Sequence, residues 1–505
     1  MKWLEWFKRW LLEHDGRNAA VLVLSLVSLA PLAVTPIVPL TDLGSTVGAS
    51  GLLLDALFGK APIADLYFVN PNLVPYWTGY VFLALVGLVV GPVMAAKALV
   101  AVCVIAMPLS LLRLARALGR DWAVVTFGFL LAWDLNLYWG WVTFHLGMSL
   151  AVWALALLIE ADSWKAAARL IPLTALVALT HAHAVVLLTL GALLTAVGRA
   201  RPFRSAALHA VSCLGFLVLT PWLWSEVLKP KPGSGPMSFV SPPVNERIGK
   251  VFEHALGYFV DQPGLGLVSV VFLVIVGVSL FAGALLARGD APRPALVLAV
   301  VATPLLLYLF LPFEVRGPVP HWWTYPRFAT LVLGALLLVP NVMPSPRARW
   351  GLVGAALAVT LALSAVRLSQ FRLYGAHVRP YLELVEQMPE GSRFLPLDLE
   401  IFFPGFREPS LGQLHGYAAA ARHSYDPHLF DHSAMPLLYR PHVQPPTPDW
   451  YKPQATYTSA MAQHYDYVLI TPPSRDFLPS VEPRVLELVG ERGAWRLYRV
   501  LKPSP

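Results

Sequence analysis

The amino-acid sequence predicts an all-α polytopic membrane protein with about 11–13 transmembrane helices, followed by a small C-terminal extracytoplasmic α/β domain. Of the 505 residues, 56% are hydrophobic and only 13% are charged, and the mean hydropathy is +0.59. Apolar runs recur between residues 18 and 370, and beyond residue 371 charged residues, His and Pro become more frequent. A soluble multidomain protein of this length does not have this composition.

The first 17 residues predict an amphipathic helix that lies in the membrane interface. Trp3, Trp6 and Trp10 recur at helical spacing, while Lys2 and Arg9 fall toward the other side, which is the pattern of an interfacial helix. The apolar run 18–40 predicts the first transmembrane helix. This run is too long for a signal peptide and lacks a small-residue cleavage site, so we expect a cytoplasmic N-terminus.

Residues 18–370 form the predicted transmembrane domain, with a first outer loop at 41–72. Several later apolar runs are shorter than the roughly 20 residues that a full span needs. These runs are 73–90, 93–112, 122–138, 144–159, 170–181, 184–197, 206–228, 265–287, 295–311, 328–343 and 352–368.

Basic clusters between the runs predict which side of the membrane each loop faces. Four clusters alternate consistently as cytoplasmic: Lys165 with Arg169, Arg199 to Arg204, Arg288 with Arg293, and Arg347 with Arg349. The cluster Arg113, Arg116 and Arg120 is inconsistent, because counting from the N-terminus places it outside and counting back from Lys165 places it inside. We therefore expect that one short run between residues 122 and 197 dips without crossing, or that one long run is split.

Residues 371–505 predict the extracytoplasmic α/β domain. Residues 378–388 and 481–489 have helical patterns, and 393–397, 465–471 and 494–501 have the patterns of strands. Such an alternation favours a small domain that packs on the outer membrane surface.

Composition also excludes some classes of protein. The two cysteines, Cys103 and Cys213, lie inside apolar runs, so the chain has neither a disulfide framework nor a CxxC motif. The net charge of +8 comes from short clusters between apolar runs. Because topology explains such clusters, we do not expect a nucleic-acid partner.

The first outer loop carries the charged residues Asp42, Asp55, Lys60 and Asp65. Asp42 stands directly at the predicted exit of the first transmembrane helix. A carboxylate is costly at this position unless it has a use or a partner. Two interpretations stay open: Asp42 contacts substrate or acts in catalysis, or it caps the short helix that follows.

Several segments together resemble bacterial GT-C-type integral membrane glycosyltransferases, which depend on polyprenyl-phosphate sugars and are related to the ArnT/PMT-like superfamily. The segments are IADLYFVNPNLVPYW, WGWVTFHLGMSL, LTHAHAVV, HWWTYPRFATLVL and, in the tail, YDYVLITPP with LVGERGAWRLYRV. The resemblance covers essentially the whole chain. It implies a polyprenyl-phosphate-linked sugar donor, an acceptor that enters from the outer side, and a place in the cell envelope at the bacterial cytoplasmic (inner) membrane.

The resemblance also implies a general base near the end of the first helix, and by position this residue is Asp42. Related sequences often carry a second acidic residue or a histidine a few positions later, where this chain has Gly44, Ser45 and Thr46. The loop has no DxD-like pair, so a divalent metal stays open as an alternative that no sequence motif supports. The sequence names neither the sugar nor the acceptor.

Cationic and polar residues at the outer ends of the predicted helices are candidates for the rest of the site. Guanidinium groups bind phosphate in a bidentate way. The candidates for the donor phosphate are Arg327, Arg316, His321 and Lys60, and the candidates for a cavity are His181, Asp65 and His145. The competing interpretations are interface snorkelling for the arginines, a solvated loop for Lys60, and helix packing for the histidines.

Two histidine patterns favour no metal site. His181 and His183 are two residues apart, so on a helix we expect them to point to different sides. A second run lacks the spacing of a zinc motif and predicts a solvated loop. This run contains His423, Asp426, His428, Asp431 and His432.

The predicted function is transfer of a sugar from a polyprenyl phosphate to an extracytoplasmic acceptor. A noncatalytic GT-C-like membrane scaffold or lipid-binding protein is the alternative. A transporter is disfavoured, because no internal repeat of matched, broken helices is visible.

Overall fold

The computed structural model describes residues 16–227, 235–259, 269–279, 293–317, 320–341, 344–430, 435–441, 443–470 and 485–502. The predicted interfacial helix at residues 1–17 lies almost wholly outside these residues. The chain divides into two compact units. We call Met1–Pro31, Ala101–Leu137 and Val142–Leu368 the helical unit, and Leu32–Val100, Tyr138–Trp141 and Ser369–Pro505 the loop-and-tail unit.

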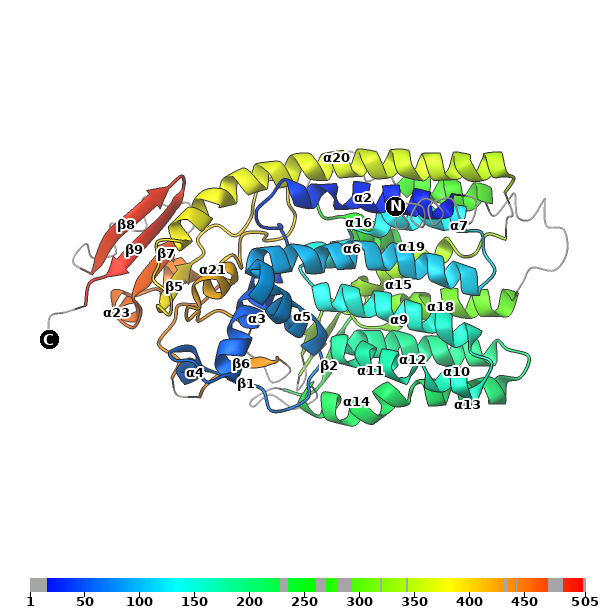
Figure 1. Ribbon diagram of the computed structural model, residues 1–505, viewed down its shortest axis with the longest axis horizontal. Coiled ribbons are helices and arrows are strands. Elements are labelled where there is room, and N and C mark those ends of the chain that lie inside the picture. The colour runs from blue at the N-terminus through cyan, green and yellow to red at the C-terminus, as the bar shows by residue number, and fades with distance from the viewer. Residues whose placement is uncertain are drawn as a thin grey trace, which may run out of the picture. The chain divides into compact units, whose positions relative to one another are not determined.

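The protein is mainly helical, with small sheets (Figure 1). Three helices of the described residues are long and apolar enough to cross a membrane: α6 (Pro92–Ala117), α9 (Val142–Glu160) and α20 (Pro346–Val385). Helix α13 (Pro202–Ser212) and the first part of α14 (Leu214–Val227) meet at a bend of 58°. Counted together as one span, they raise the number to four. This number is lower than the 11–13 helices expected from the sequence.

The other apolar runs form shorter or broken helices. The run 122–138 consists of α7 (Trp122–Val125), the 3-10 segment η2 (Thr126–Leu131) and α8 (Leu135–Tyr138). The remaining elements of the helical unit are α2 (Arg17–Leu29), η1 (Ala30–Ala33), α10 (Trp164–Ala168), α11 (Ile171–Thr180), α12 (Ala182–Val197), β2 (Ser238–Val240), α15 (Val244–Gly249), α16 (Val251–Leu256), α18 (Pro294–Phe310), β3 (Glu314–Arg316), β4 (His321–Trp322), η3 (Pro326–Phe328) and α19 (Ala329–Leu336).

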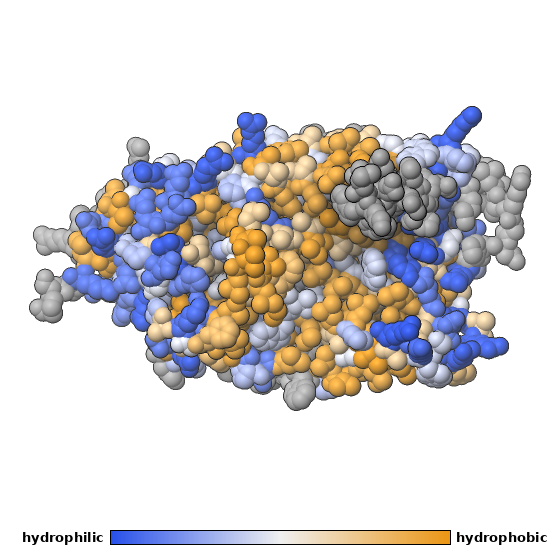
Figure 2. All heavy atoms as spheres, in the orientation of Figure 1, coloured by the Kyte–Doolittle hydropathy of each residue, from blue (hydrophilic) through white to orange (hydrophobic). Residues whose placement is uncertain are grey.

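Large apolar side chains remain exposed on these helices. Figure 2 shows hydrophobic residues spread over the drawn face of the helices, whereas hydrophilic residues gather over the strands and loops of the tail. Examples of exposed residues are Leu193 at 59%, Val218 at 66%, Leu298 at 70% and Phe310 at 73%. An exposed apolar surface of this kind is typical of helices that contact lipid.

The basic clusters of the helical unit gather at one end. Arg113 pairs with Glu160, and Arg293 Nη1 lies 2.5 Å from the carbonyl oxygen of Ala117. The contested cluster at 113–120 therefore lies beside the others. Three further contacts join the same end: Arg349 with Asp121 at 2.8 Å, Arg199 with the Leu158 carbonyl at 3.1 Å, and Arg204 with the Asp162 carbonyl at 2.9 Å.

The loop-and-tail unit combines the first outer loop with the C-terminal residues. The loop forms α3 (Leu43–Leu57), α4 (Ile63–Leu66) and β1 (Tyr67–Val69), and α5 (Trp77–Val90) follows. β1 pairs antiparallel with β6 (Leu437–Tyr439) from the tail. The remaining elements of the tail are α21 (His415–Arg422), α22 (Pro453–Thr456) and α23 (Ser459–Ala462).

The tail also contains a four-stranded sheet in the order β5-β7-β9-β8. The predicted strands at 393–397, 465–471 and 494–501 are confirmed as β5 (Phe394–Leu397), β7 (Tyr467–Ile470) and β9 (Trp495–Val500). The predicted helix at 481–489 is wrong from Leu486 on, and 481–484 lie outside the described residues. β8 (Leu486–Arg492) instead pairs antiparallel with β9 across Gly493, whose φ of +59° suits a tight turn.

Helices α3 and α21 pack closely through glycines, side by side in Figure 1. A Cβ atom on Gly48 would lie 2.8 Å from Cα of Gly416, and one on Gly416 would lie 2.0 Å from the carbonyl oxygen of Gly44. Only residues without side chains permit this approach. The start of α3, where Asp42 stands, is therefore fixed against the tail.

Candidate functional site

The backbone of Asp42 is anchored to the short segment Tyr138–Trp141. The amide of Thr41 donates to the carbonyl of Tyr138 at 3.0 Å, and the amide of Asp42 donates to the carbonyl of Trp139 at 2.9 Å. Gly140 has a φ of +80°, and a Cβ atom there would lie 2.5 Å from the Asp42 nitrogen. Glycine is thus required both for the backbone conformation and for the close approach.

The Asp42 side chain faces residues that are distant in sequence. Asp42 stands at the N-cap position of α3, but its side chain makes no capping hydrogen bond. Instead, Trp141 Nε1 donates to Oδ2 at 2.9 Å and Gln413 Nε2 donates to Oδ1 at 3.2 Å. Helix capping therefore does not account for this carboxylate.

The same packing explains why no second acid stands at positions 44–46, directly after Asp42. A Cβ atom on Gly44 would lie 1.7 Å from the carbonyl oxygen of Gln413, so no side chain fits there. Ser45 is fully buried and Thr46 is 7% exposed. A carboxylate at these positions would need a buried partner of its own.

A second carboxylate, Glu408 of the tail, lies near enough to feel the charge of Asp42. The Glu408 side chain is only 12% exposed. Burial raises its pKa to about 7, Arg407 opposes the shift, and the charge of Asp42 adds to it. A buried acid beside another acid titrates near neutral pH, as general acids and bases often do.

Two tryptophans form an aromatic surface next to the carboxylate. The rings of Trp139 and Trp141 are stacked, with centroids 5.3 Å apart and planes 12° apart, and both side chains are half-buried. The apolar face of a sugar ring packs well on such surfaces, while the indole nitrogens donate hydrogen bonds.

The other candidates of the first loop make their contacts with residues other than Asp42. Lys60 Nζ lies 2.9 Å from Asp55 Oδ1 and is 65% exposed, and His423 also pairs with Asp55. These three residues line a pocket of about 400 Å³ whose other walls include residues of α3, α5 and α21. Asp65 is exposed in the first turn of α4.

Three candidates of the helical unit come together around Phe144 and His183. The Arg327 guanidinium lies 5.5 Å from the Phe144 ring centroid. The His181 ring meets Phe144 edge-on at 5.2 Å, and the His321 ring lies 6.2 Å from His183. Arg327 is held by Nε, which donates to the Trp323 carbonyl at 3.0 Å.

The expectation that His181 and His183 point to different sides is wrong. His181 has extended backbone angles, φ −166° and ψ 136°, because it stands at the N-cap of α12 rather than inside a helix. The two rings lie 5.2 Å apart. Helical periodicity therefore does not apply to this pair.

Arg316 and His145 contact residues other than those gathered around Phe144 and His183. Arg316 is 61% exposed and pairs with Glu314, two residues away in β3. His145 is fully buried, and its Nε2 lies 3.6 Å from Asp134 Oδ1. Asp134 also accepts a hydrogen bond from Thr330 at 2.7 Å, so this pair lies within the packing of the unit.

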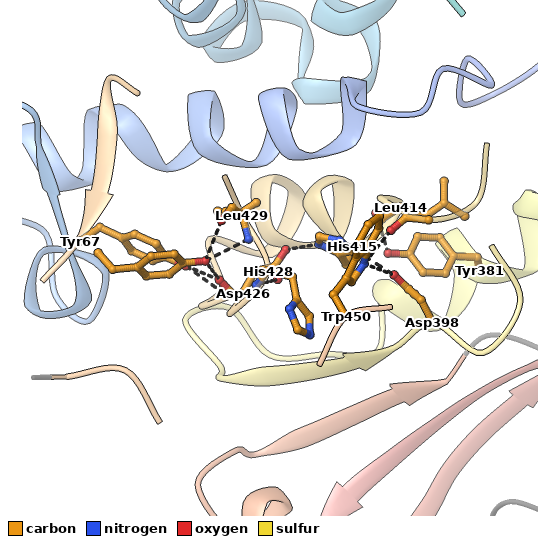
Figure 3. A network of polar contacts seen from close by, with 11 residues as sticks. Tyr67, Tyr381, Asp398, Leu414, His415, Asp426, His428, Leu429 and Trp450 are labelled. Atoms are coloured by element: carbon orange, nitrogen blue, oxygen red, sulfur yellow. Dashed lines mark hydrogen bonds and ion pairs between the residues drawn. The ribbon is translucent and has the colours of Figure 1, made fainter. Parts of the chain in front are cut away.

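A buried polar network lies in the tail (Figure 3). His415 Nδ1 lies 2.5 Å from Asp426 Oδ2, and Trp450 donates to Asp398 at 3.2 Å. Tyr67 from the first loop donates to the Asp426 carbonyl at 2.8 Å. The expectation of a solvated loop around Asp426 is wrong, because this residue is fully buried; Asp431 and His432 lie outside the described residues.

Burial and charge shift the titration of this network. Burial lowers the pKa of His415, but the charge and hydrogen bond of Asp426 outweigh it, so the net shift is upward. Burial raises the pKa of Asp398 to about 6 and lowers that of His428 to about 4. A protonated His415 between two carboxylates is therefore favoured.

In the part of the chain that the structure describes, no group of three or more His, Cys, Asp or Glu side chains could hold a metal ion.

Sequence reasoning missed Gln413, Glu408 and Trp141 as partners of Asp42. Gln413 is 371 positions from Asp42, and no periodicity links residues at that separation. Trp141 could have been found from the glycine that stands between Trp139 and Trp141, because a glycine at such a position indicates a turn or a close approach of two backbone segments.

Comparisons with known proteins give no assignment: no family model, no curated protein sequence and no solved structure matches this chain.

Proposed function

We propose that this chain is a multi-pass membrane glycosyltransferase of GT-C type. It moves a sugar from a polyprenyl-phosphate donor to an extracytoplasmic acceptor, and Asp42 is the general base. The observation that carries the proposal is the Asp42 carboxylate, which occupies an N-cap position without capping and is held by Trp141 and Gln413.

The chemistry needs a fixed carboxylate. Displacing a lipid phosphate from an anomeric carbon requires a group that takes the acceptor's hydroxyl proton. An ionised carboxylate has about four acceptor positions on its two oxygens, so Asp42 can keep the hydrogen bonds from Trp141 and Gln413 and still receive a proton. The two donors hold the carboxylate at one orientation.

Glu408 supplies a second acid near Asp42, which the positions directly after Asp42 do not carry. At neutral pH it is divided between its protonated and ionised forms, because its pKa is raised to about 7. A protonated Glu408 near the Asp42 carboxylate avoids two neighbouring negative charges. When Asp42 has accepted a proton, its charge no longer opposes the ionisation of Glu408.

The departing phosphate needs cationic donors. Arg327, His321 and His181 lie together within the helical unit and are our candidates for this role, because a guanidinium beside imidazoles binds phosphate oxygens well. In this proposal the N-terminus is cytoplasmic, the tail is extracytoplasmic, and the basic end of the helical unit faces the cytoplasm.

The test is sugar transfer in proteoliposomes, with wild-type protein and a panel of polyprenyl-phosphate sugars. Asp42→Asn should lower the rate by about 10²–10⁴-fold, the usual contribution of a general base. The matched control Asp162→Asn changes an exposed carboxylate and should leave the rate unchanged. Unchanged transfer by a folded Asp42→Asn protein would remove Asp42 as the base, and absence of transfer by the wild type with every donor would favour the noncatalytic scaffold.

A further inference from the structure

A basic pocket lies at the arginine-rich end of the helical unit, and the proposed reaction does not use it. Its volume is about 480 Å³, which is within the usual range for ligand pockets. The polar side is formed by Arg17, Arg113, Arg116 and Arg120, and the apolar side includes Leu109 and Trp153.

Three of the four arginines have no carboxylate partner among the described residues. Arg113 is neutralised by Glu160, and the pocket's own acid, Asp121, pairs with Arg349 at 2.8 Å. Arg17 and Arg120 donate to the side-chain oxygens of asparagines, at 3.4 Å and 2.6 Å. Among the described residues that line the pocket, the four arginines therefore face a single acid, Asp121.

One of these arginines is buried and only partly satisfied. Arg120 is 9% exposed, and its Nε has no hydrogen-bond partner in the part of the chain that is described. A buried donor without a partner costs free energy. In addition, the charges of Arg17 and Arg116 lie close enough to repel each other. An anion in the pocket would relieve both costs.

The positive-inside rule alone does not explain this arrangement. Arginines that only set topology can extend into solvent, whereas Arg120 is turned into the protein. Trp122 and Trp153 line the pocket, and Trp153 is 37% exposed. Tryptophans of this kind stand at the level of lipid headgroups.

We propose that this pocket binds an anionic phospholipid. The phosphate lies among Arg17, Arg116 and Arg120, and the start of an acyl chain lies along Leu109 and Trp153. Since three cations face the site, a lipid with two phosphates binds more tightly than a lipid with one.

The experiment measures lipid binding to the full chain in neutral detergent by native mass spectrometry. The probes are cardiolipin, phosphatidylglycerol and phosphatidylcholine, with inorganic pyrophosphate as a free anion of similar charge. We expect cardiolipin to bind most tightly and phosphatidylcholine most weakly. Arg17→Gln and Arg116→Gln should each weaken cardiolipin binding by about fivefold, the effect of one arginine near a membrane surface.

Two controls separate a built site from general surface charge. Arg169→Gln changes an exposed arginine outside the pocket and should leave the affinity unchanged. Arg120→Lys keeps the charge but removes Nε and the planar fork, and it should still weaken binding. Melting temperatures show which variants are folded, and Arg116 is exposed, so its variant should fold.

Three results would overturn the proposal. The first is an equal loss of affinity in Arg169→Gln and Arg116→Gln. The second is equal binding of phosphatidylcholine and cardiolipin. The third is binding of pyrophosphate that cardiolipin does not displace, which would indicate a site for a soluble anion.

Discussion

Trp141 Nε1 lies 2.9 Å from Oδ2 of Asp42, although the two residues are 99 positions apart in the sequence. The backbone of the same short segment also binds the backbone around Asp42, through the carbonyls of Tyr138 and Trp139. The carboxylate is thus held by its main chain and by its side chain from one neighbouring segment. This double attachment fixes the orientation on which the proposed proton transfer depends.

The hydrogen bond from Trp141 can be removed without removing the ring. In Trp141→Phe we expect sugar transfer to fall about tenfold, because a hydrogen bond to a charged group contributes about 1.5–3 kcal/mol. The measurement is kcat and KM in proteoliposomes. Trp164→Phe, at a tryptophan that is 55% exposed, is the control. An unchanged kcat in Trp141→Phe would mean that this contact does not orient the base.

The close packing of α3 on α21 predicts a strong effect of a single methyl group. Gly44→Ala would place Cβ 1.7 Å from the Gln413 carbonyl oxygen, so we expect a loss of stability of about 1–3 kcal/mol or more. Thermal unfolding in detergent measures this loss. In Gly87→Ala the nearest atom is 3.9 Å away, and this control should keep its melting temperature. Equal melting temperatures of both variants would contradict the packing.

Glu408 predicts how stability depends on pH. Its pKa is raised from 4.5 to about 7 in the folded protein, so the folded state binds the proton more tightly than the unfolded state. The stability from this group is fully present below pH 4.5 and is lost as the pH rises to about 7. The melting temperature should therefore fall over this window, and Glu408→Gln should flatten the fall.

The control for this measurement is Glu383→Gln, since Glu383 is 53% exposed. It should keep the wild-type pH dependence. A Glu408→Gln protein whose melting temperature falls as steeply as that of the wild type would show that Glu408 is not a titrating buried acid.

The buried pair of His415 and Asp426 predicts a structural role. Asp426→Asn leaves the imidazole buried without its charged partner, so we expect a destabilisation of about 3–5 kcal/mol. Chemical unfolding measures it, with Glu390→Gln, whose side chain is 69% exposed, as the control. A destabilisation no larger than that of the control would mean that the pair is solvated in solution.

The basic clusters lie at one end of the helical unit, and this predicts on which side of the membrane the C-terminal end of α6 lies. We expect a membrane-impermeant maleimide to label Arg116→Cys and Arg201→Cys from the same side of the membrane. Arg116 lies near enough to Arg17 for their charges to interact. The later basic clusters lie at the same end, because Arg293 contacts Ala117 and Arg199 contacts Leu158. The native Cys103 and Cys213 are buried and should stay unlabelled. Labelling from opposite sides would contradict this arrangement.

Hydropathy located most helices but not their lengths. The predicted runs 93–112, 144–159 and 352–368 correspond to α6, α9 and α20, because a long apolar run has few alternatives to helix. The run 122–138 is broken into three pieces, which periodicity does not anticipate. Arg17 and Arg116 line the same pocket, which conflicts with counting three crossings before Arg113; the expectation that one run between residues 122 and 197 dips without crossing, or that one long run is split, stays a prediction.

The sequence alone predicted Asp42 as a site residue but not the residues that surround it. Asp42 could be singled out because a charge after an apolar run is conspicuous. Glu408 and Gln413 could not, because they precede α21 and come near Asp42 through the tertiary packing of α21 on α3, which includes Gly44, Gly48 and Gly416. Asp426 was misassigned to a solvated loop for the same reason: its partners Tyr67 and His415 lie 359 and 11 positions away.

Whether Asp42 is the general base is tested by the rate of sugar transfer by Asp42→Asn at saturating donor and acceptor, with donor binding measured on the same preparation. We expect that the donor still binds while the rate falls by about 10²–10⁴-fold. A folded Asp42→Asn protein that binds donor and transfers sugar at the wild-type rate would contradict it.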